Sequence, residues 1–131
     1  NGPLLRHDPN PWMLEAVAGM IDARATPEAA AYREASEEAQ LTITHLEDAG
    51  SHYPSAGSTT DYFYNYVGLC DLPKDDPYFG GLAEEGEDLR LHPMSFDTAM
   101  GLLDTGEIGS GPLYHLLYWL ARHRDRLRQM A

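Results

Sequence analysis

The sequence predicts one α/β (α+β) layered domain in which helices cover a β-sheet. Short apolar and aromatic stretches typical of strands alternate along the chain with longer segments that carry helix caps and helical periodicity. The length of 131 residues is enough for one domain with a hydrophobic core and too short for two. We therefore expect residues 1–131 to form a single domain.

The N-terminal third is predicted to contain a loop, a strand and a helix. Three prolines within the first eleven residues indicate a loop, and the apolar residues 12–17 are consistent with a short strand. Thr26 is a suitable N-cap and Pro27 a suitable first helical residue. These signals predict a helix that ends at about Ala39.

The rest of the chain is predicted to alternate between strands and helices. Its aromatic side chains make residues 61–72 the strongest strand candidate. The other expected elements are a strand at 41–46, a turn-rich segment at 51–60, a long loop at 73–88, a strand at 89–94, a helix at 95–103 capped by Ser95, a turn at 106–111, and a final helix from Pro112. The leucines of that last helix recur on one face, which indicates that the face is buried.

The charge balance bears on the class of ligand. Nine basic residues stand against 21 acidic ones, for a net charge of −12. A surface that contacts duplex nucleic acid needs the opposite sign, so we expect no nucleic-acid partner. A polyanionic substrate would also be repelled unless divalent cations mediated the contact.

Targeting signals are absent from the sequence. A single cysteine, Cys70, fits a reducing compartment, and no apolar run approaches the length of about 18 residues needed to span a bilayer. We therefore expect a cytoplasmic protein without membrane attachment. The chain begins at Asn1 rather than at a methionine, which leaves an upstream leader open.

The predicted helix at 26–39 carries the chemically informative residues. Glu34 and Glu38 are four positions apart and project from the same face, where they repel each other unless a cation lies between them. Oxygen ligands in this relation suit Mg²⁺, which takes its remaining ligands from water and phosphate. Arg33 can pair with Glu37 and orient the cluster. Taken alone, the same residues also fit a solvated acidic helix face.

The context of these residues resembles the Nudix box. That box is Gly, five residues, Glu, seven residues, then Arg-Glu-apolar-any-Glu-Glu-any-Gly-apolar. Its matching positions here are Gly19, Arg33, Glu34, Ala35, Glu37, Glu38 and Leu41. Two positions depart from the box: Ala25 stands in place of Glu and Gln40 in place of the Gly that ends the helix. If the left-handed backbone is kept at position 40, Gln costs on the order of 1 kcal/mol there.

The resemblance extends to ADP-ribose pyrophosphatases on both sides of the box. Residues 12–22 are similar to the segment of that family in which a backbone carbonyl before the box Gly binds metal, which implies a metal-ligating role for Ala18 and substrate contact at Gly19. Residues 53–61 resemble a substrate-contacting loop, which implies substrate binding by Gly57 and Asp61.

An acidic segment at 81–90 is similar to the loop that closes over substrate in these enzymes. By that resemblance Glu85 is the general base and Glu87 joins Glu34 and Glu38 as a metal ligand, with Arg33 and Glu37 as further catalytic residues. The family also implies a mixed β-sheet sandwiched between helices, a homodimer, and additional N-terminal strands that this chain lacks.

The resemblance implies Mg²⁺- or Mn²⁺-dependent hydrolysis of the pyrophosphate bond of a nucleoside diphosphate sugar. Our first expectation is ADP-ribose, cut to AMP and ribose 5-phosphate. GDP-mannose or another nucleotide sugar is the alternative substrate. A non-catalytic Nudix-fold sensor of ADP-ribose is the alternative from a different class, supported only by Ala25 and Gln40.

Overall fold

The computed structural model describes residues 2–73, 77–80 and 89–131. The α+β class is confirmed. The predicted alternation of strands and helices is wrong, because in the described ranges two helices come first, all the strands follow in succession, and two helices end the chain. In chain order the elements are α1 (Gly2–Leu5), α2 (Pro27–Ala39), β1 (His45–His52), β2 (Phe63–Leu69), β3 (Tyr78–Gly80), β4 (Leu89–Leu91), α3 (Phe96–Asp104) and α4 (Gly111–Arg128).

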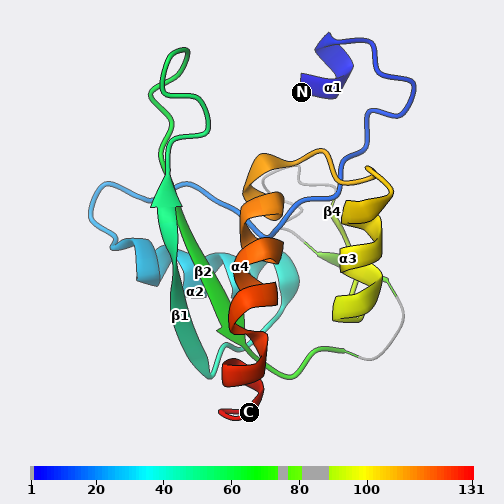
Figure 1. Ribbon diagram of the computed structural model, residues 1–131. Coiled ribbons are helices and arrows are strands. Elements are labelled where there is room, and N and C mark those ends of the chain that lie inside the picture. The colour runs from blue at the N-terminus through cyan, green and yellow to red at the C-terminus, as the bar shows by residue number, and fades with distance from the viewer. Residues whose placement is uncertain (1, 74–76, 81–88) are drawn as a thin grey trace.

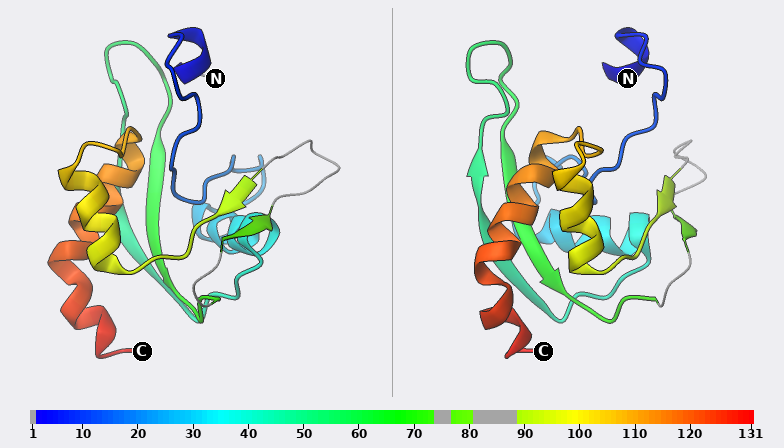
Figure 2. Two further views of the ribbon diagram at one scale, coloured as in Figure 1. Left: turned by 90° about the vertical axis from the view of Figure 1, so that its right-hand side faces the viewer. Right: turned by 45° about the vertical axis from the view of Figure 1, so that its right-hand side comes forward.

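The β1–β2 hairpin forms the middle layer of the molecule. Its strands pair antiparallel, with His45 opposite Leu69 and His52 opposite Phe63. Helix α4 crosses one face of this hairpin, and α2 lies on the other (Figures 1 and 2). Strands β3 and β4 pair antiparallel beside α2. Within the described ranges the strands therefore form two ladders, where we expected one mixed sheet, and helices lie on both sides of the longer ladder.

Three side-chain hydrogen bonds support the hairpin where the register of β1 shifts between Asp48 and Ser51. His115 Nε2 on α4 donates to the carbonyl of Ala49 at 2.6 Å. The buried Asn65 amide on β2 donates to the Gly50 carbonyl and to His52 Nδ1, each at 2.9 Å. The irregular stretch of β1 therefore has polar partners from two other elements.

The hydrophobic core lies between the last two helices. Leu103, Ile108 and Leu117 are buried together. Side chains from α3 and α4 pack around them, namely Ala99, Met100, Leu102, Leu113 and Tyr114. The leucine face expected on the final helix contributes Leu113 and Leu117 to this core. On α2 the buried residues are alanines, which let that helix approach its neighbours closely.

The predicted helix starts are confirmed by their caps. The Thr26 hydroxyl accepts from the Ala29 N–H at 3.1 Å, and Ser95 caps α3 through the N–H of Thr98 at 3.1 Å. Helix α4 begins one residue before the expected Pro112, with Ser110 as its N-cap. The caps of α2 and α3 were thus expected from the sequence, whereas the Ser110 cap of α4 was not.

The predicted strand at 12–17 is wrong. These residues are irregular and belong to neither ladder. A strand requires a neighbour for its backbone groups, and here the N–H of Trp12 donates to the side chain of Asn10 at 3.3 Å. Apolar composition gave this segment its strand signal, but the described residues provide no strand to pair with it.

The strand predicted at 41–46 starts later and extends into the segment expected to be a turn. Gln40 adopts the left-handed conformation (φ 56°, ψ 34°), and the N–H of Leu41 bonds back to the carbonyl of Ala35 at 3.0 Å. This cap holds the chain at the helix end. Pairing begins at the N–H of Thr44, which donates to Leu69, and β1 then runs to His52.

Three further expectations were only partly met. The N-terminal loop contains the short helix α1, which stands apart from the body (Figures 1 and 2). The loop expected at 73–88 includes strand β3, and the strand expected at 89–94 ends at Leu91.

None of the helices in the described ranges has the length and apolar character that crossing a membrane requires.

Candidate active site

Helix α2 and the loop before it form the walls of a cavity of about 430 Å³. Every site residue that the sequence predicts on α2 lines it. The complete lining is Ala18, Gly19, Met20, Asp22, Arg33, Glu34, Glu37 and Glu38. Four of these eight residues are acidic, so the cavity carries strong negative charge apart from Arg33.

The loop at 18–22 runs along the acidic face of α2. The N–H of Ala18 donates to Glu38 Oε2 at 3.3 Å. Gly19 lies against Glu34 so closely that a Cβ built on it would be 2.0 Å from the Glu34 carboxyl carbon. A glycine is therefore required at this position by the approach of the helix side chain.

Arg33 ties this loop to the helix. Its Nη1 pairs with Asp22, and its Nη2 donates to the Met20 carbonyl at 2.8 Å and to Glu34 Oε1 at 2.6 Å. The expected pair with Glu37 is also present, with 3.8 Å between Nε and Oε2. One guanidinium thus contacts three carboxylates and a backbone carbonyl.

The hydrogen bond to Glu34 raises the pKa of Arg33 above its ordinary value, against the opposing effect of desolvation. The charges of Asp22, Glu34 and Glu37 add to this rise. Arg33 therefore remains a cation at every pH at which the protein would be studied.

The donor atoms around the cavity suit a hard divalent cation. Carboxylates of Glu34 and Glu38 face it together with the backbone of Ala18, and all offer oxygen ligands of the kind that Mg²⁺ and Mn²⁺ take. No group of three acids or histidines in the described ranges is already gathered at metal-binding distances. Arg33 contacts Glu34, and the Ala18 N–H donates to Glu38.

Glu85 and Glu87, expected as general base and metal ligand, lie outside the described residues. The residues that flank their segment lie beside the end of α2. Gly80 is paired with Leu89, and a Cβ on Gly80 would be 1.8 Å from the carbonyl oxygen of Glu38. The Tyr78 hydroxyl donates to the carbonyl of Ala39 at 2.6 Å. Strand β3 thus lies against the end of α2, close to Glu38, and β4 pairs with it.

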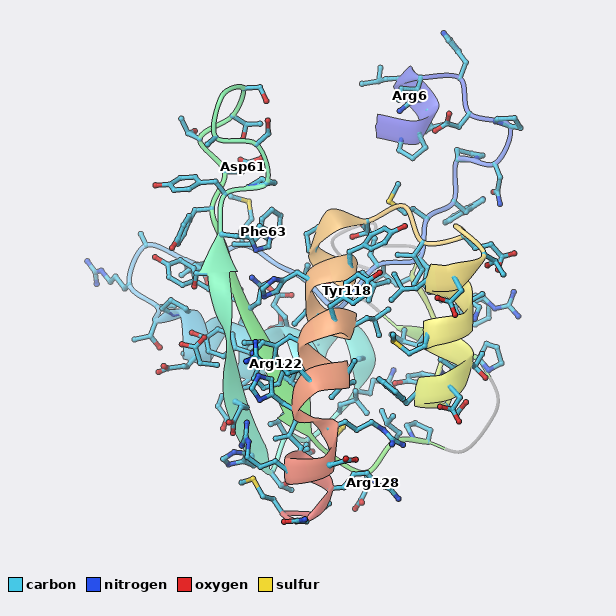
Figure 3. The ribbon with its side chains drawn as sticks, in the orientation of Figure 1. Arg6, Asp61, Phe63, Tyr118, Arg122 and Arg128 are labelled. Atoms are coloured by element: carbon cyan, nitrogen blue, oxygen red, sulfur yellow. The ribbon has the colours of Figure 1, made fainter. Side chains whose placement is uncertain are left out.

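The two residues expected to contact substrate from the second half of the chain do not line the cavity. Gly57 and Asp61 lie on the loop that joins β1 to β2, which projects from one end of the hairpin (Figure 1). Figure 3 shows Asp61 beyond the end of β2, past Phe63. Both residues are exposed, and the Asp61 N–H donates to the Thr59 hydroxyl at 2.8 Å.

Sequence reasoning missed Asp22. It lies inside the box, three residues after Gly19, at a position where the box specifies no residue type. Its signal was weak, because an acid in a polar loop is normally a solvated residue. Only the folded chain shows that Asp22 meets the guanidinium of Arg33, eleven residues further on.

Comparison with known proteins gives a consistent picture. The NUDIX domain family model matches residues 3–117. The chain is 36% identical over 118 residues to the ADP-ribose pyrophosphatase of Escherichia coli (strain K12), a match that covers 90% of this chain and 56% of that protein. It is 32% identical over 120 residues to the ADP-ribose pyrophosphatase of Haemophilus influenzae, with 92% and 55% covered.

A more distant match is the GDP-mannose pyrophosphatase of Enterobacter sp. (strain 638), 28% identical over 113 residues, with 86% of this chain and 58% of that protein covered. The chain therefore spans a little over half the length of the curated relatives it matches.

Proposed function

Because this chain belongs to the Nudix family, we propose that it hydrolyses the pyrophosphate bond of a nucleoside diphosphate sugar in a reaction that depends on Mg²⁺ or Mn²⁺. ADP-ribose is the proposed substrate, with AMP and ribose 5-phosphate as products. The observation that carries the proposal is the cavity in which Glu34 and Glu38 face the backbone of Ala18 and Gly19. A pyrophosphate cannot enter so acidic a cavity without cations to neutralise it.

The proposed division of roles follows the positions of the side chains. Glu34, Glu38 and the Ala18 carbonyl, joined by Glu87, would hold the divalent ions. When bound, such ions neutralise charge on the phosphates and make a coordinated water easier to deprotonate. Glu85 would accept a proton from the attacking water. The oxygen of that water would form a bond to one phosphorus, and the bond from this phosphorus to the bridging oxygen would break, so that the bridging oxygen leaves with the other phosphate.

The proposed catalytic role of Arg33 and Glu37 is to orient this cluster. Arg33 fixes one oxygen of Glu34 through a charge-assisted hydrogen bond and reaches Glu37 through Nε. Gly19 leaves room for the carboxylate of Glu34 at the cavity wall. Gly57 and Asp61 are proposed to contact the part of the substrate that extends out of the cavity.

The candidate substrates come from the names of two kinds of relatives. Proteins named ADP-ribose pyrophosphatase match this chain at 32–36% identity, and GDP-mannose pyrophosphatases at 27–30%. ADP-ribose is thus favoured, and GDP-mannose is the second candidate. A homodimer in the cytoplasm is the proposed state of the protein.

The direct test is a hydrolysis screen of nucleotide sugars with Mg²⁺ and with Mn²⁺, followed by Glu38→Gln and Glu85→Gln. We expect turnover of ADP-ribose by the wild type and a loss of about 100-fold or more in both variants, since a ligand and a proton acceptor are removed. Circular dichroism would confirm that the variants fold. Near-normal turnover by both variants would refute the assigned roles. ADP-ribose binding without any hydrolysis would instead support the sensor alternative.

A further inference from the structure

Asp22 is held at the edge of the cavity by a contact that the box residues do not explain. It lies in the loop before α2 with its side chain 75% exposed, yet it pairs with Nη1 of Arg33. An exposed ion pair of this kind adds little to folding stability, because water screens it. Its position beside Arg33 and Glu34 points instead to a role in arranging the site.

Arg33 and a divalent cation would draw on the same carboxylate. Glu34 gives Oε1 to Arg33 Nη2 at 2.6 Å, and only 15% of its side chain is exposed. If the guanidinium had no other anionic partner, it would pair more strongly with the Glu34 carboxylate. It would then compete with a metal ion for that carboxylate. The partners of Nη1 therefore influence how available Glu34 is to a metal ion.

Asp22 is the partner of Nη1 among the described residues. Ala25, three residues further along, has no charge to contribute, and its N–H donates to the Asp22 carbonyl at 2.9 Å. This turn folds positions 22 and 25 back on each other. In this loop the anionic partner of Arg33 is therefore residue 22 and not residue 25.

We propose that Asp22 is a positioning residue that anchors Arg33 through Nη1 and thereby keeps Glu34 available to a divalent cation. The inference rests on the proposed function, since it assigns Asp22 a part in the same metal-dependent site. It predicts that removing the charge of Asp22 weakens metal binding while the fold is retained. It also predicts that a carboxylate at the neighbouring position 25 can take over this role.

The test is Mn²⁺ binding to the full-length protein, followed by the electron paramagnetic resonance signal of the free ion. Asp22→Asn is expected to weaken Mn²⁺ binding about tenfold, as is typical when a residue that orients a metal ligand is lost. Asp22→Glu keeps the carboxylate and should bind Mn²⁺ with an affinity within about twofold of the wild type. The control Glu28→Gln removes an exposed acid on α2 that does not line the cavity, and its Mn²⁺ affinity should also stay within about twofold. Adding Ala25→Glu to Asp22→Asn should recover most of the lost affinity.

The Arg33 Nε–H resonance gives a second readout that needs no metal, and we expect it to shift in Asp22→Asn but not in Glu28→Gln. Wild-type Mn²⁺ affinity in Asp22→Asn, or an equal loss in Glu28→Gln, would overturn the role of Asp22. Failure of the wild type itself to bind Mn²⁺ would overturn the proposed function, and the role of Asp22 with it.

Discussion

Gly19 shows how one missing side chain can shape the candidate site. A Cβ on Gly19 would lie 2.0 Å from both the carboxyl carbon and Oε1 of Glu34, so the carboxylate would have to move away from Arg33. We expect Gly19→Ala to lower metal-dependent turnover by about 10–100-fold, the usual effect of disturbing a ligand's support. Steady-state kinetics over a Mg²⁺ titration would measure it.

Gly101→Ala is the matched control, because a Cβ at that position in α3 meets no atom within 4 Å. It should leave turnover unchanged. Equal activity in Gly19→Ala and the wild type would show that the position of Glu34 does not matter.

Glu47 on β1 makes the folding stability of the protein depend on pH in the acidic range. Its carboxylate accepts hydrogen bonds from His45 at 2.8 Å and from Arg126 on α4 at 2.7 Å, and these lower its pKa below the ordinary value. A carboxylate with a lowered folded-state pKa contributes stability above its unfolded pKa of about 4.3, and this contribution is lost as the pH falls through the folded-state pKa.

Glu47→Gln should therefore reduce the urea midpoint at pH 7, with the difference from wild type disappearing in acid below the folded-state pKa of Glu47. Urea titrations across this pH range would measure it, with Glu15→Gln as the control, since Glu15 is an exposed acid outside the helices and strands. A difference that stayed constant from neutral pH into acid would contradict this role.

Among the elements, α2 is followed by a cap residue, Gln40, in a conformation that glutamine does not favour. Gln40 has φ 56°, which glycine adopts freely and other residues adopt only with strain. We expect Gln40→Gly to raise the free energy of unfolding by about 1 kcal/mol. Denaturation in urea would measure the gain. Gln40→Ala keeps the Cβ and should show no such gain, and equal stability of the two variants would be evidence against strain.

The irregular stretch of β1 depends on Asn65. This side chain is 5% exposed and donates both of its N–H groups, one to Gly50 and one to His52. We expect Asn65→Ala to destabilise the protein by about 1–3 kcal/mol, because two hydrogen bonds of a buried side chain are lost, each worth about 0.5–1.5 kcal/mol. Thermal unfolding beside Ser51→Ala, an exposed neighbour across the hairpin, would measure this. A midpoint equal to that of Ser51→Ala would contradict it.

The elements differ in how far the sequence could predict them. Helix α2 carries local signals at both ends, from the Thr26 cap to the position of Gln40, so its bounds and its left-handed end could be anticipated. Residues 12–17 carry only an apolar composition, and strand formation depends on a partner that no local pattern reveals. The start of β1 was misplaced for a related reason, since pairing with Leu69 sets it.

The same distinction holds within the site. Glu34 and Glu38 follow from helical spacing, and the box identified them together with Arg33. Asp22 could not be found in this way, because its contact with Arg33 joins a loop to a helix and has no fixed spacing in sequence.

At the scale of the molecule, apolar side chains are exposed along the segment before α2. Trp12 is 72% exposed and Met20 86%, and Met13, Val17 and Ile21 are exposed beside them. Several large apolar side chains exposed along one segment are typical of a surface that is covered in an assembly. We expect a dimer in analytical ultracentrifugation at micromolar concentration, weakened by Trp12→Ser. A wild type that stayed monomeric across the concentration range would contradict the proposed homodimer.

We propose above all that the cavity between the loop at 18–22 and α2 binds divalent cations together with a pyrophosphate. Anomalous diffraction from crystals grown with Mn²⁺ and a non-hydrolysable ADP-ribose analogue tests it most directly. We predict manganese peaks in contact with Glu34, Glu38 and the Ala18 carbonyl, beside the phosphates of the analogue. An analogue bound elsewhere, with no manganese peak in this cavity, would contradict the claim.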